Sequence, residues 1–312
     1  MALINLLLLI YCGCLETIVI GLGGNALLSP RGKQSFGKEL GSAKGTARAI
    51  ARLSKEYRIL LTHGNGTQVG DELLKNMGSI EPLPLYLLNA ETQASIGSML
   101  ETALNSEKPA RPFCTIVTHV FVDKHDPAFS NPTKPIGPFY TKAQLEKALK
   151  REKFSYIEER KMFRRVVPSP MPRGILEIKQ IMHLLKRFNV ICGGGGGVPV
   201  YREHSSYMGA NAVIDKDYAT QLIANIIGAK RMIILTNTDY VYRNFEDKST
   251  FIRKAKKEYM KNILGNLEEG TIKPKVDACI KFIENGGRIA QIGSINKINE
   301  VIAMKSGTII TW

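Results

Sequence analysis

Three short apolar runs in this sequence end directly in glycine-rich turns, and this repeated pattern leaves few folds open. The runs begin at Thr17, Arg58 and Asn189, and the turns that follow them read GLGGNA, HGNG and GGGGG. A buried strand, a tight turn and then a helix, repeated along a chain, is typical of a parallel sheet. In such sheets the ligand-binding groups lie at the carboxyl ends of the strands. We therefore predict an α/β fold with a site at that edge.

The first turn, from Gly21 to Ala26, also fits the dinucleotide-binding fingerprint, so a nicotinamide-dependent enzyme is one alternative. The full fingerprint includes an acidic residue about 20 positions further on, which binds the ribose. The stretch 41–50 carries no carboxylate, and the next apolar run ends in His63. The nicotinamide interpretation is therefore a minor alternative, and the glycine turn favours a phosphate.

Length and composition fit one large α/β domain, or one domain with a sizeable insertion. The chain has 312 residues, of which 44% are hydrophobic, and this is enough to bury a full core. The formal net charge is +15, but the Lys and Arg are scattered and no nucleic-acid-binding motif is evident. The basic runs 150–165 and 254–261 alternate with Glu and apolar residues, as solvated helix faces do. We expect no nucleic acid as a partner.

Residues 1–16 are interpreted as an apolar extension of a domain that covers 17–312. This extension lacks a basic region ahead of its apolar run, and it is too short to cross a bilayer as a helix. The five cysteines include no CxxC pair, which favours a reducing compartment over a disulfide framework or a zinc site. Asn65 is a formal glycosylation acceptor, but a glycan would disrupt its glycine turn. We expect a cytoplasmic protein without membrane association and without a metal bound by protein side chains.

A proline-rich stretch interrupts the regular pattern after an apolar run at 115–122, which we predict to be a strand. Residues 123–140 contain four prolines in 18 residues, and 142–153 look helical. Long irregular loops in compact domains are often lids or binding loops. We predict that about 120–172 forms an inserted lid subdomain. Within it, the stiff backbone around Lys134 presents an ammonium group to a small anion.

Charged residues lie at the start of two predicted helices near the end of the chain. In VIDKDYA, Asp215 and Asp217 flank Lys216, and in GTIKPKV, Lys275 follows a proline. Carboxylates at a helix start either cap the helix or orient the lysine beside them, and both interpretations remain open.

Two further helices are predicted at 91–104 and 174–188. The first has small residues along one face, which favours core packing over a dimer seam. His63 stands beside Gly-Asn-Gly, where histidine is more often a hydrogen-bonding turn residue than a catalytic acid or base.

The motifs of this sequence and their order along the chain resemble those of the carbamate kinases, which are part of the amino acid kinase superfamily. The matching segments run from about Thr17 to the end of the chain: GLGGNAL, THGNGTQVG, DPAFSNPTKPIGPFY, VVPSPMP, GGGGVPV, AVIDKDYATQLIA, LTNTDYVY and GTIKPKV. PTKPIGPFY and IDKD are the most specific, because other amino acid kinases share the glycine turns but lack this lid. The resemblance implies a three-layer α/β/α sandwich around a mainly parallel sheet of about eight strands, with a protruding lid.

The resemblance also implies reversible phosphoryl transfer between carbamoyl phosphate and ADP, giving ATP and carbamate. Mg²⁺ bound to the nucleotide and a homodimer are implied as well. Such a transfer needs fixed donors around the spreading charge, and it needs no general base because the carbamate oxygen is already anionic. The open alternatives are a relative acting on another small carboxylate or phosphate, and an inactive regulatory or binding homologue.

Roles follow for the residues that match the motifs. The resemblance places the transferred phosphoryl group against Gly23, Gly24 and Asn25, and carbamate beside Gly64 and Asn65. The implied catalytic residues are the lid lysine Lys134, the phosphate-binding Lys216, the orienting Asp217 and Lys275, which closes on ATP. The implied nucleotide-binding residues are Gly195, Gly196, Asp239, Tyr242 and Lys275.

Overall fold

The largest sheet has eight strands in the order β15-β17-β16-β12-β1-β2-β9-β3, and within it only the β16–β17 pair is antiparallel. The computed structural model describes residues 15–23, 36–76, 80–150, 152–159, 161–268 and 271–312, with the backbone alone for 36–44. The strands are β15 (Lys254–Lys256), β17 (Thr308–Thr311), β16 (Ile289–Ser294), β12 (Arg231–Thr236), β1 (Thr17–Leu22), β2 (Arg58–His63), β9 (Asn189–Ile191) and β3 (Phe113–Thr115). The predicted mainly parallel sheet is therefore confirmed.

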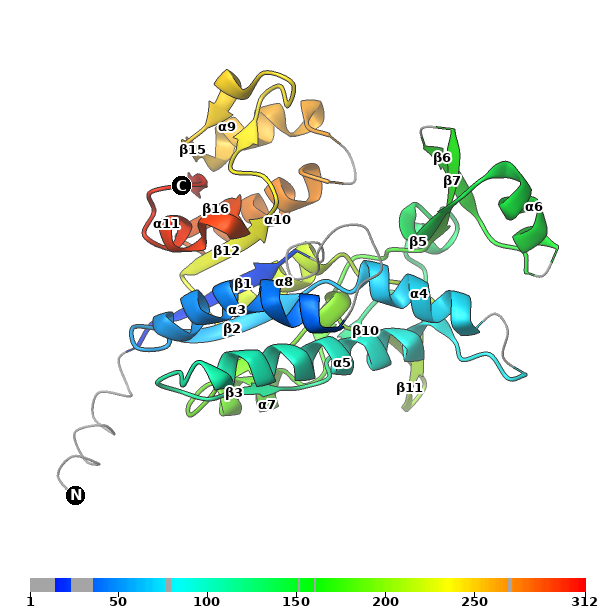
Figure 1. Ribbon diagram of the computed structural model, residues 1–312, viewed down its shortest axis with the longest axis horizontal. Coiled ribbons are helices and arrows are strands. Elements are labelled where there is room, and N and C mark those ends of the chain that lie inside the picture. The colour runs from blue at the N-terminus through cyan, green and yellow to red at the C-terminus, as the bar shows by residue number, and fades with distance from the viewer. Residues whose placement is uncertain (1–14, 24–35, 77–79, 151, 160, 269–270) are drawn as a thin grey trace.

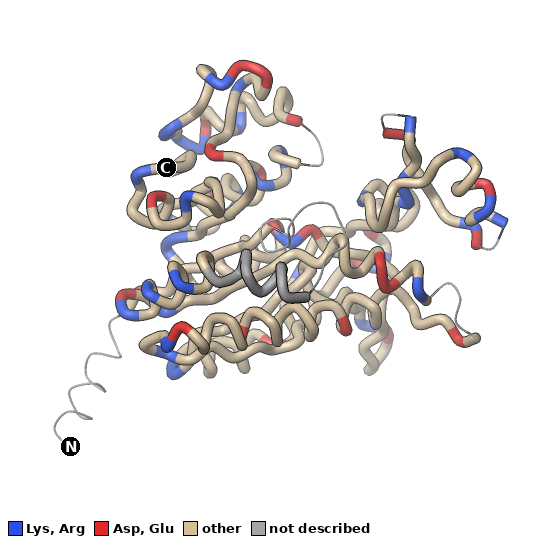
Figure 2. Tube along the Cα trace, viewed as in Figure 1, with Lys and Arg blue, Asp and Glu red and all other residues tan. Residues whose placement is uncertain are grey.

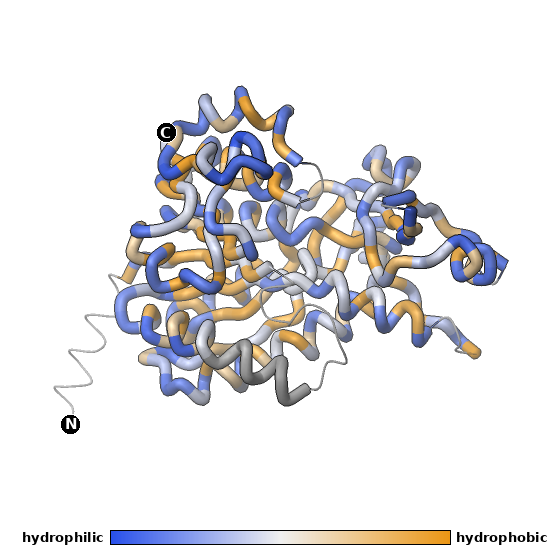
Figure 3. Tube along the Cα trace, turned by 45° about the horizontal axis from the view of Figure 1, so that its top comes forward, coloured by the Kyte–Doolittle hydropathy of each residue, from blue (hydrophilic) through white to orange (hydrophobic). Residues whose placement is uncertain are grey.

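Helices cover both faces of this sheet (Figure 1). One face carries α3 (Phe36–Leu53), α5 (Leu85–Ser106) and α11 (Ile298–Ile302). The other carries α7 (Ile178–Leu184), α8 (Lys216–Ile226), α9 (Lys257–Ile263) and α10 (Lys273–Glu284). In β1, Ile18 and Ile20 pack with the first group, whereas Val19 packs with the second. Since both faces are buried, the central strands are almost continuously hydrophobic, as Figure 3 shows.

A second, three-stranded sheet projects from these layers (Figure 1) and forms the protruding lid, residues 134–167. It contains β5 (Lys134–Tyr140), β7 (Met162–Val167) and β6 (Tyr156–Glu159), together with α6 (Lys142–Leu149). At its base, Gly70 of α4 (Gly66–Asn76) meets the backbone of Gly137, so a Cβ on Gly70 would lie 2.2 Å from the Cα of Gly137. Ile136 and Val167 of the lid pack in one apolar cluster with Val69 of α4. The lid base is therefore fixed against α4 by close packing.

One predicted strand proved to be two. Residues 115–122 are divided between β3 and β4 (His119–Phe121), and β4 belongs to a separate four-stranded sheet. The other strands of that sheet are β11 (Ser206–Gly209), β10 (Val198–Glu203) and β8 (Gly174–Ile175). Between β3 and β4, the hydroxyl of Thr118 accepts from the N–H of Gly193 at 3.0 Å, and its carbonyl accepts from Val198 at 2.8 Å. The chain leaves the main sheet here, where Thr118 binds the glycine turn after β9 and the first residue of β10.

Two predicted helices are shorter than expected. Thr141 caps α6 through a reciprocal capping box with Gln144, which explains its start, but α6 ends at Leu149 instead of near 153. Within 174–188, the first residues form β8, and only Ile178–Leu184 are helical. The pairing of β8 with β4 extends this backbone, and the helix cannot begin until the strand has ended.

Charged residues of both signs are distributed over the described chain (Figure 2). Lys and Arg are intermixed with Asp and Glu over the core and the lid (Figure 2). No helix among the described residues is both long enough and apolar enough to cross a membrane. Residues 1–14 of the predicted N-terminal extension lie outside the described residues.

Candidate active site

A cleft of about 280 Å³ opens where the lid meets the carboxyl ends of the central strands. Its walls come from the turn after β2, the glycine turn after β9, the first turns of α8 and α10, and the lid. Four cationic side chains and two carboxylates line it: Lys134, Arg164, Lys216, Lys275, Asp215 and Asp217. The cleft therefore has an excess of positive charge, which favours an anionic ligand.

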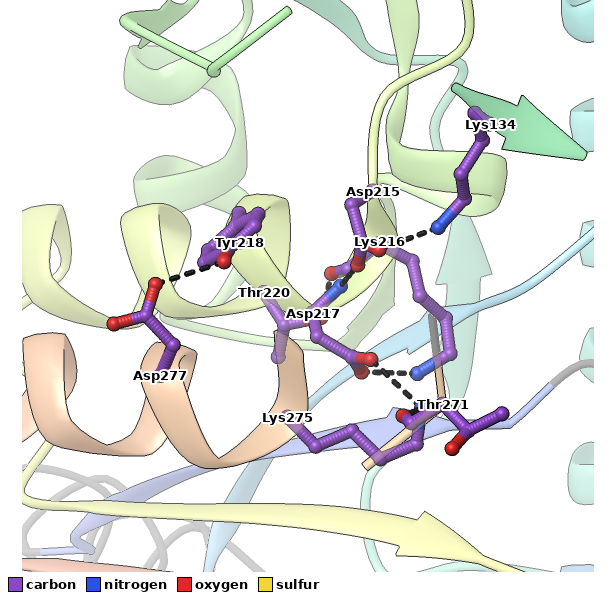
Figure 4. Close-up of polar contacts among 9 residues, drawn as sticks. All are labelled: Lys134, Asp215, Lys216, Asp217, Tyr218, Thr220, Thr271, Lys275 and Asp277. Atoms are coloured by element: carbon purple, nitrogen blue, oxygen red, sulfur yellow. Dashed lines mark hydrogen bonds and ion pairs between the residues drawn. The ribbon is translucent and has the colours of Figure 1, made fainter. Parts of the chain in front are cut away.

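Asp217 is the centre of the charged cluster. Its side chain is 3% exposed and accepts from Nζ of Lys216 and, at 3.0 Å, from Nζ of Lys275 (Figure 4). Burial alone would raise the pKa of Asp217, but the two neighbouring ammonium groups outweigh burial and lower this pKa well below its ordinary range. Asp217 is therefore ionised at neutral pH and fixes both ammonium groups.

The two lysines differ in how their charge is stabilised. Burial lowers the pKa of Lys216 and the charge of Lys275 adds to this effect, although Asp217 opposes it. Burial also acts against the charge of Lys275, but here the carboxylates of Asp217 and Asp215 prevail and raise the pKa. Both lysines lie in first helical turns, where the helix dipole is positive. An anion placed between these helix starts would be stabilised from both sides.

Asp215 joins the start of α8 to the lid. Its Oδ1 accepts from the backbone N–H of Asp217 at 2.9 Å and caps the helix. Its Oδ2 accepts from Nζ of Lys134 at 2.5 Å. The two interpretations that the sequence left open therefore apply to different residues, because Asp215 caps the helix and Asp217 orients the buried lysines.

The glycine turn after β9 leaves no room for side chains. Gly195 has a φ of +62°, and a Cβ there would lie 2.2 Å from Nδ2 of Asn65. That amide nitrogen donates to Oδ1 of Asn89 at 2.5 Å and to the hydroxyl of Thr92 at 2.9 Å. Asn89 in turn donates to the carbonyl of Gly197 at 2.7 Å. Buried polar side chains of α5 thus hold the turns after β2 and β9 together.

The sequence did not predict this role of α5, because its small residues indicated only core packing or a dimer seam. The available signal was the set of polar residues within it, Asn89, Thr92 and Gln93, all of which are buried. Buried amides and hydroxyls need hydrogen-bond partners. The glycine turns supply them for Asn89 and Thr92, and the backbone of Thr118 supplies them for Gln93.

His63 has a structural role in the same region, as the sequence favoured. Its side chain is buried, and burial lowers its pKa to about 4, with a smaller contribution from the charge of Lys216. Nδ1 lies 3.2 Å from the carbonyl of Gly64. At neutral pH the imidazole is therefore uncharged and packed against the turns.

Arg164 was not predicted as a site residue. It lies on β7 of the lid and lines the cleft, and its Nε donates to the carbonyl of Gly137 at 3.0 Å. The next residue, Arg165, binds Glu152 through both terminal nitrogens, at 2.9 and 2.7 Å. Successive strand residues point to opposite sides, so only one arginine of the pair can reach the cleft.

A larger cavity of about 630 Å³ adjoins the cleft, and Lys275 lines both. Its wall includes aromatic residues around β13 (Val241–Tyr242) and β14 (Phe251–Ile252). The rings of Tyr242 and Phe245 lie edge to face, with centroids 5.9 Å apart. The hydroxyl of Thr238 is buried in this wall without a partner among the described residues. The cavity thus offers apolar ring surfaces and a polar group for a ligand.

The structure brings most of the predicted site residues together. The cleft is lined by Lys134, Lys216, Asp217, Lys275, Gly64 and Asn65. Tyr242 and Lys275 line the larger cavity. The backbone N–H of Gly23 donates to the carbonyl of Leu235 at 3.0 Å, just beyond β1. Gly24 and Asn25 lie outside the described residues.

Three predicted nucleotide-binding residues are not among those that line the larger cavity. Gly195 lines the smaller cleft instead. Gly196 has a φ of +88°, and a Cβ there would lie 2.4 Å from the carbonyl oxygen of Ile214. The carboxylate of Asp239 pairs with Lys297 at 2.7 Å. Their assignment to the nucleotide stays a prediction.

Comparison with known proteins identifies the family. The model of the amino acid kinase family matches residues 16–294. The carbamate kinase of Pyrococcus horikoshii is 38% identical over 311 residues, covering 95% of this chain and 99% of the relative. That of Thermoplasma acidophilum is 40% identical over 310 residues, with 95% and 99% covered. The solved structure of carbamate kinase from Giardia lamblia bound to AMP-PNP has a TM-score of 0.86, with 32% identity and 96% and 99% covered. The chain therefore belongs to the amino acid kinase family and, within it, to the carbamate kinases.

Proposed function

We propose that this protein transfers a phosphoryl group reversibly between carbamoyl phosphate and ADP, giving ATP and carbamate. The observation that carries the proposal is the pair of adjoining cavities that share Lys275, one small and cationic and the other larger and aromatic. A small anion suits the first and a nucleotide suits the second. The presence of Lys134, Lys216, Asp217 and Lys275 in one cluster argues against an inactive homologue.

In this proposal the nucleotide base lies against the rings of Tyr240 and Tyr242, and its phosphates point toward Lys275. Carbamoyl phosphate lies in the cleft beside Gly64 and Asn65, under Lys134. Both substrates then meet at the carboxyl ends of β1 and β2, where open parallel sheets usually bind ligands.

The chemical step forms a bond from phosphorus to the terminal ADP oxygen and breaks the bond from phosphorus to the carbamate oxygen. Lys216 and Lys275 lie beside the transferred phosphoryl group and stabilise the negative charge that spreads over its oxygens. Each such donor lowers a barrier by roughly 2.7–4 kcal/mol in comparable sites. Asp217 keeps the two ammonium groups in position, and Lys134 binds the carbamoyl end. The fixed donors and the in-line alignment account for the catalysis.

Mg²⁺ enters this proposal as part of the nucleotide substrate. Among the described residues, no group of three or more His, Cys, Asp or Glu side chains is arranged to hold a metal ion. Asp215 and Asp217 are engaged by lysines. Phosphate oxygens and water would therefore supply most of the ligands, as Mg²⁺ commonly accepts.

We extend the proposal to the organisation of the protein. Residues 17–312 act as one kinase domain, about 120–172 is the inserted subdomain that includes the lid sheet at 134–167, and the chain works as a cytoplasmic homodimer. Sedimentation at micromolar concentration tests the dimer.

Formation of ATP by the purified protein from ADP and carbamoyl phosphate tests the proposed reaction. Acetyl phosphate, a donor of similar size, is the control. We expect ATP from carbamoyl phosphate and little from acetyl phosphate. Faster turnover with acetyl phosphate would favour a relative with another substrate, and the absence of ATP with both donors would favour an inactive homologue.

A further inference from the structure

We propose that Tyr218 and Asp277 are positioning residues that hold the two lysine-bearing helices at a fixed spacing during phosphoryl transfer. Tyr218 of α8 directly follows Asp217, and Asp277 of α10 lies two residues after Lys275. The Tyr218 hydroxyl donates to Oδ2 of Asp277 at 2.8 Å (Figure 4). Neither residue lines the cleft or the larger cavity. The inference rests on the proposed function and adds residues that act through the lysines.

The surroundings of Asp277 keep this hydrogen bond in place. Lys281, one turn further along α10, also donates to Oδ2 of Asp277, and its Nζ lies 5.3 Å from the centroid of the Tyr218 ring. Burial, followed by the hydrogen bond to Asp277, raises the pKa of Tyr218 above its ordinary range. The phenol is therefore protonated at working pH and always available as the donor.

Other polar links between α8 and α10 cannot replace this one at the cleft. Among the described residues, the Asp217–Lys275 ion pair lies nearest to the cleft. At the other end of the helices, Nδ2 of Asn225 donates to the carbonyl of Phe282 at 3.0 Å. A phosphate in the cleft competes with Asp217 for the ammonium of Lys275. The hydrogen bond from Tyr218 is not exposed to that competition, so it maintains the spacing when the ion pair is weakened.

The consequence for catalysis is a loss of alignment when the link is removed. Lys275 would keep its charge, but the start of α10 could shift relative to Lys216. Small displacements of a transition-state donor reduce turnover more than they reduce substrate binding. We expect kcat to fall about tenfold in Tyr218→Phe, while the KM for ADP stays within about twofold.

A double-variant experiment separates positioning from a merely structural role. Tyr218→Phe keeps the ring and removes only the hydroxyl. Its effect on kcat is measured in the wild type and again in the Lys275→Ala background. If the link acts through Lys275, the second effect is less than about twofold. Asn225→Ala is the matched control, because it breaks a link between the same helices far from the lysines. It should lower Tm without changing kcat.

Hydrogen exchange on the same proteins gives a readout that does not depend on activity. Tyr218→Phe should speed exchange in the first two turns of α10, and Asn225→Ala should speed it near the end of that helix. Unchanged exchange at the start of α10 would overturn the link even in a protein that makes no ATP. A kcat within about twofold of wild type, or an equal loss in both backgrounds, would overturn its role in positioning. Absence of ATP formation by the wild type would instead count against the proposed function.

Discussion

The cleft contains two kinds of lysine–carboxylate contact that differ in where the partners lie. In the core, Lys216 and Lys275 meet Asp217, whose side chain is 3% exposed, and all three lie on two packed helices. At the lid, Lys134 meets Asp215, and their side chains are 32% and 13% exposed. The core contacts join buried groups on packed helices, whereas the contact at the lid is partly open to solvent. We therefore expect a substrate anion to displace the Lys134–Asp215 contact more readily than the contacts of Asp217.

The two contacts are also expected to differ in the free energy that is lost when they are broken. A fully exposed ion pair contributes about 0–1 kcal/mol, and the Lys134–Asp215 pair is intermediate between that case and a buried pair, so a substrate anion could replace Asp215 at lower cost than Asp217. A buried pair is different, because removing one partner leaves the other charge without compensation, at a cost of roughly 3–5 kcal/mol. Asp217 is thus needed whether or not substrate is bound.

The largest expected effect is on turnover after loss of a core lysine. Lys216→Ala or Lys275→Ala should lower kcat by roughly 10²–10³, because each removes a donor to the transferred phosphoryl group. Nucleotide affinity should fall much less. Initial rates of ATP formation measure both quantities. Lys124→Ala is the matched control, since Lys124 forms an exposed pair with Glu203 away from the cleft. If a core-lysine variant kept a kcat near that of Lys124→Ala, that lysine would not be a donor to the transferred phosphoryl group.

A second effect concerns stability and its dependence on pH. The pKa of Asp217 is lowered in the folded protein, so its contribution is fully present above the pKa of an unfolded carboxyl and is lost as pH falls through the folded value. Asp217→Asn should reduce the free energy of unfolding by about 3 kcal/mol at pH 7, and the difference should shrink below about pH 4. Urea denaturation of both proteins at several pH values measures this. A difference that is constant with pH would show that the charge of Asp217 does not matter.

The sequence predicted the central sheet, and the structure brings the predicted core lysines into one cleft, where their catalytic roles stay predictions. In β1, β2 and β9, a continuous apolar run followed by glycine is specific, because strands buried on both faces need that composition. The lysines in IDKD and TIKPK were singled out because these short motifs resemble those of the carbamate kinases. They meet because parallel strands and the helices after them present their ends at one edge.

The remaining features depend on contacts between distant parts of the chain. Asn89 and Thr92 lie in a helix whose pattern indicates only packing, and their partners are Asn65 and the glycine turn, which no local pattern identifies. The break between β3 and β4 follows from hydrogen bonds between Thr118 and residues 193–198. Arg164 and Arg165 are equivalent in sequence, and only the strand register shows which one reaches the cleft.

The difference between core and lid lysines is tested most directly by the Michaelis constants of Lys134→Ala for its two substrates. Lys134 is expected to bind the small substrate from the lid, so the KM for carbamoyl phosphate should rise about tenfold, while the KM for ADP changes by less than about twofold. Lys134→Arg should recover only part of the loss, because the planar guanidinium is larger than the ammonium it replaces. A rise in the KM for ADP alone, with carbamoyl phosphate unaffected, would contradict the division of roles between lid and core.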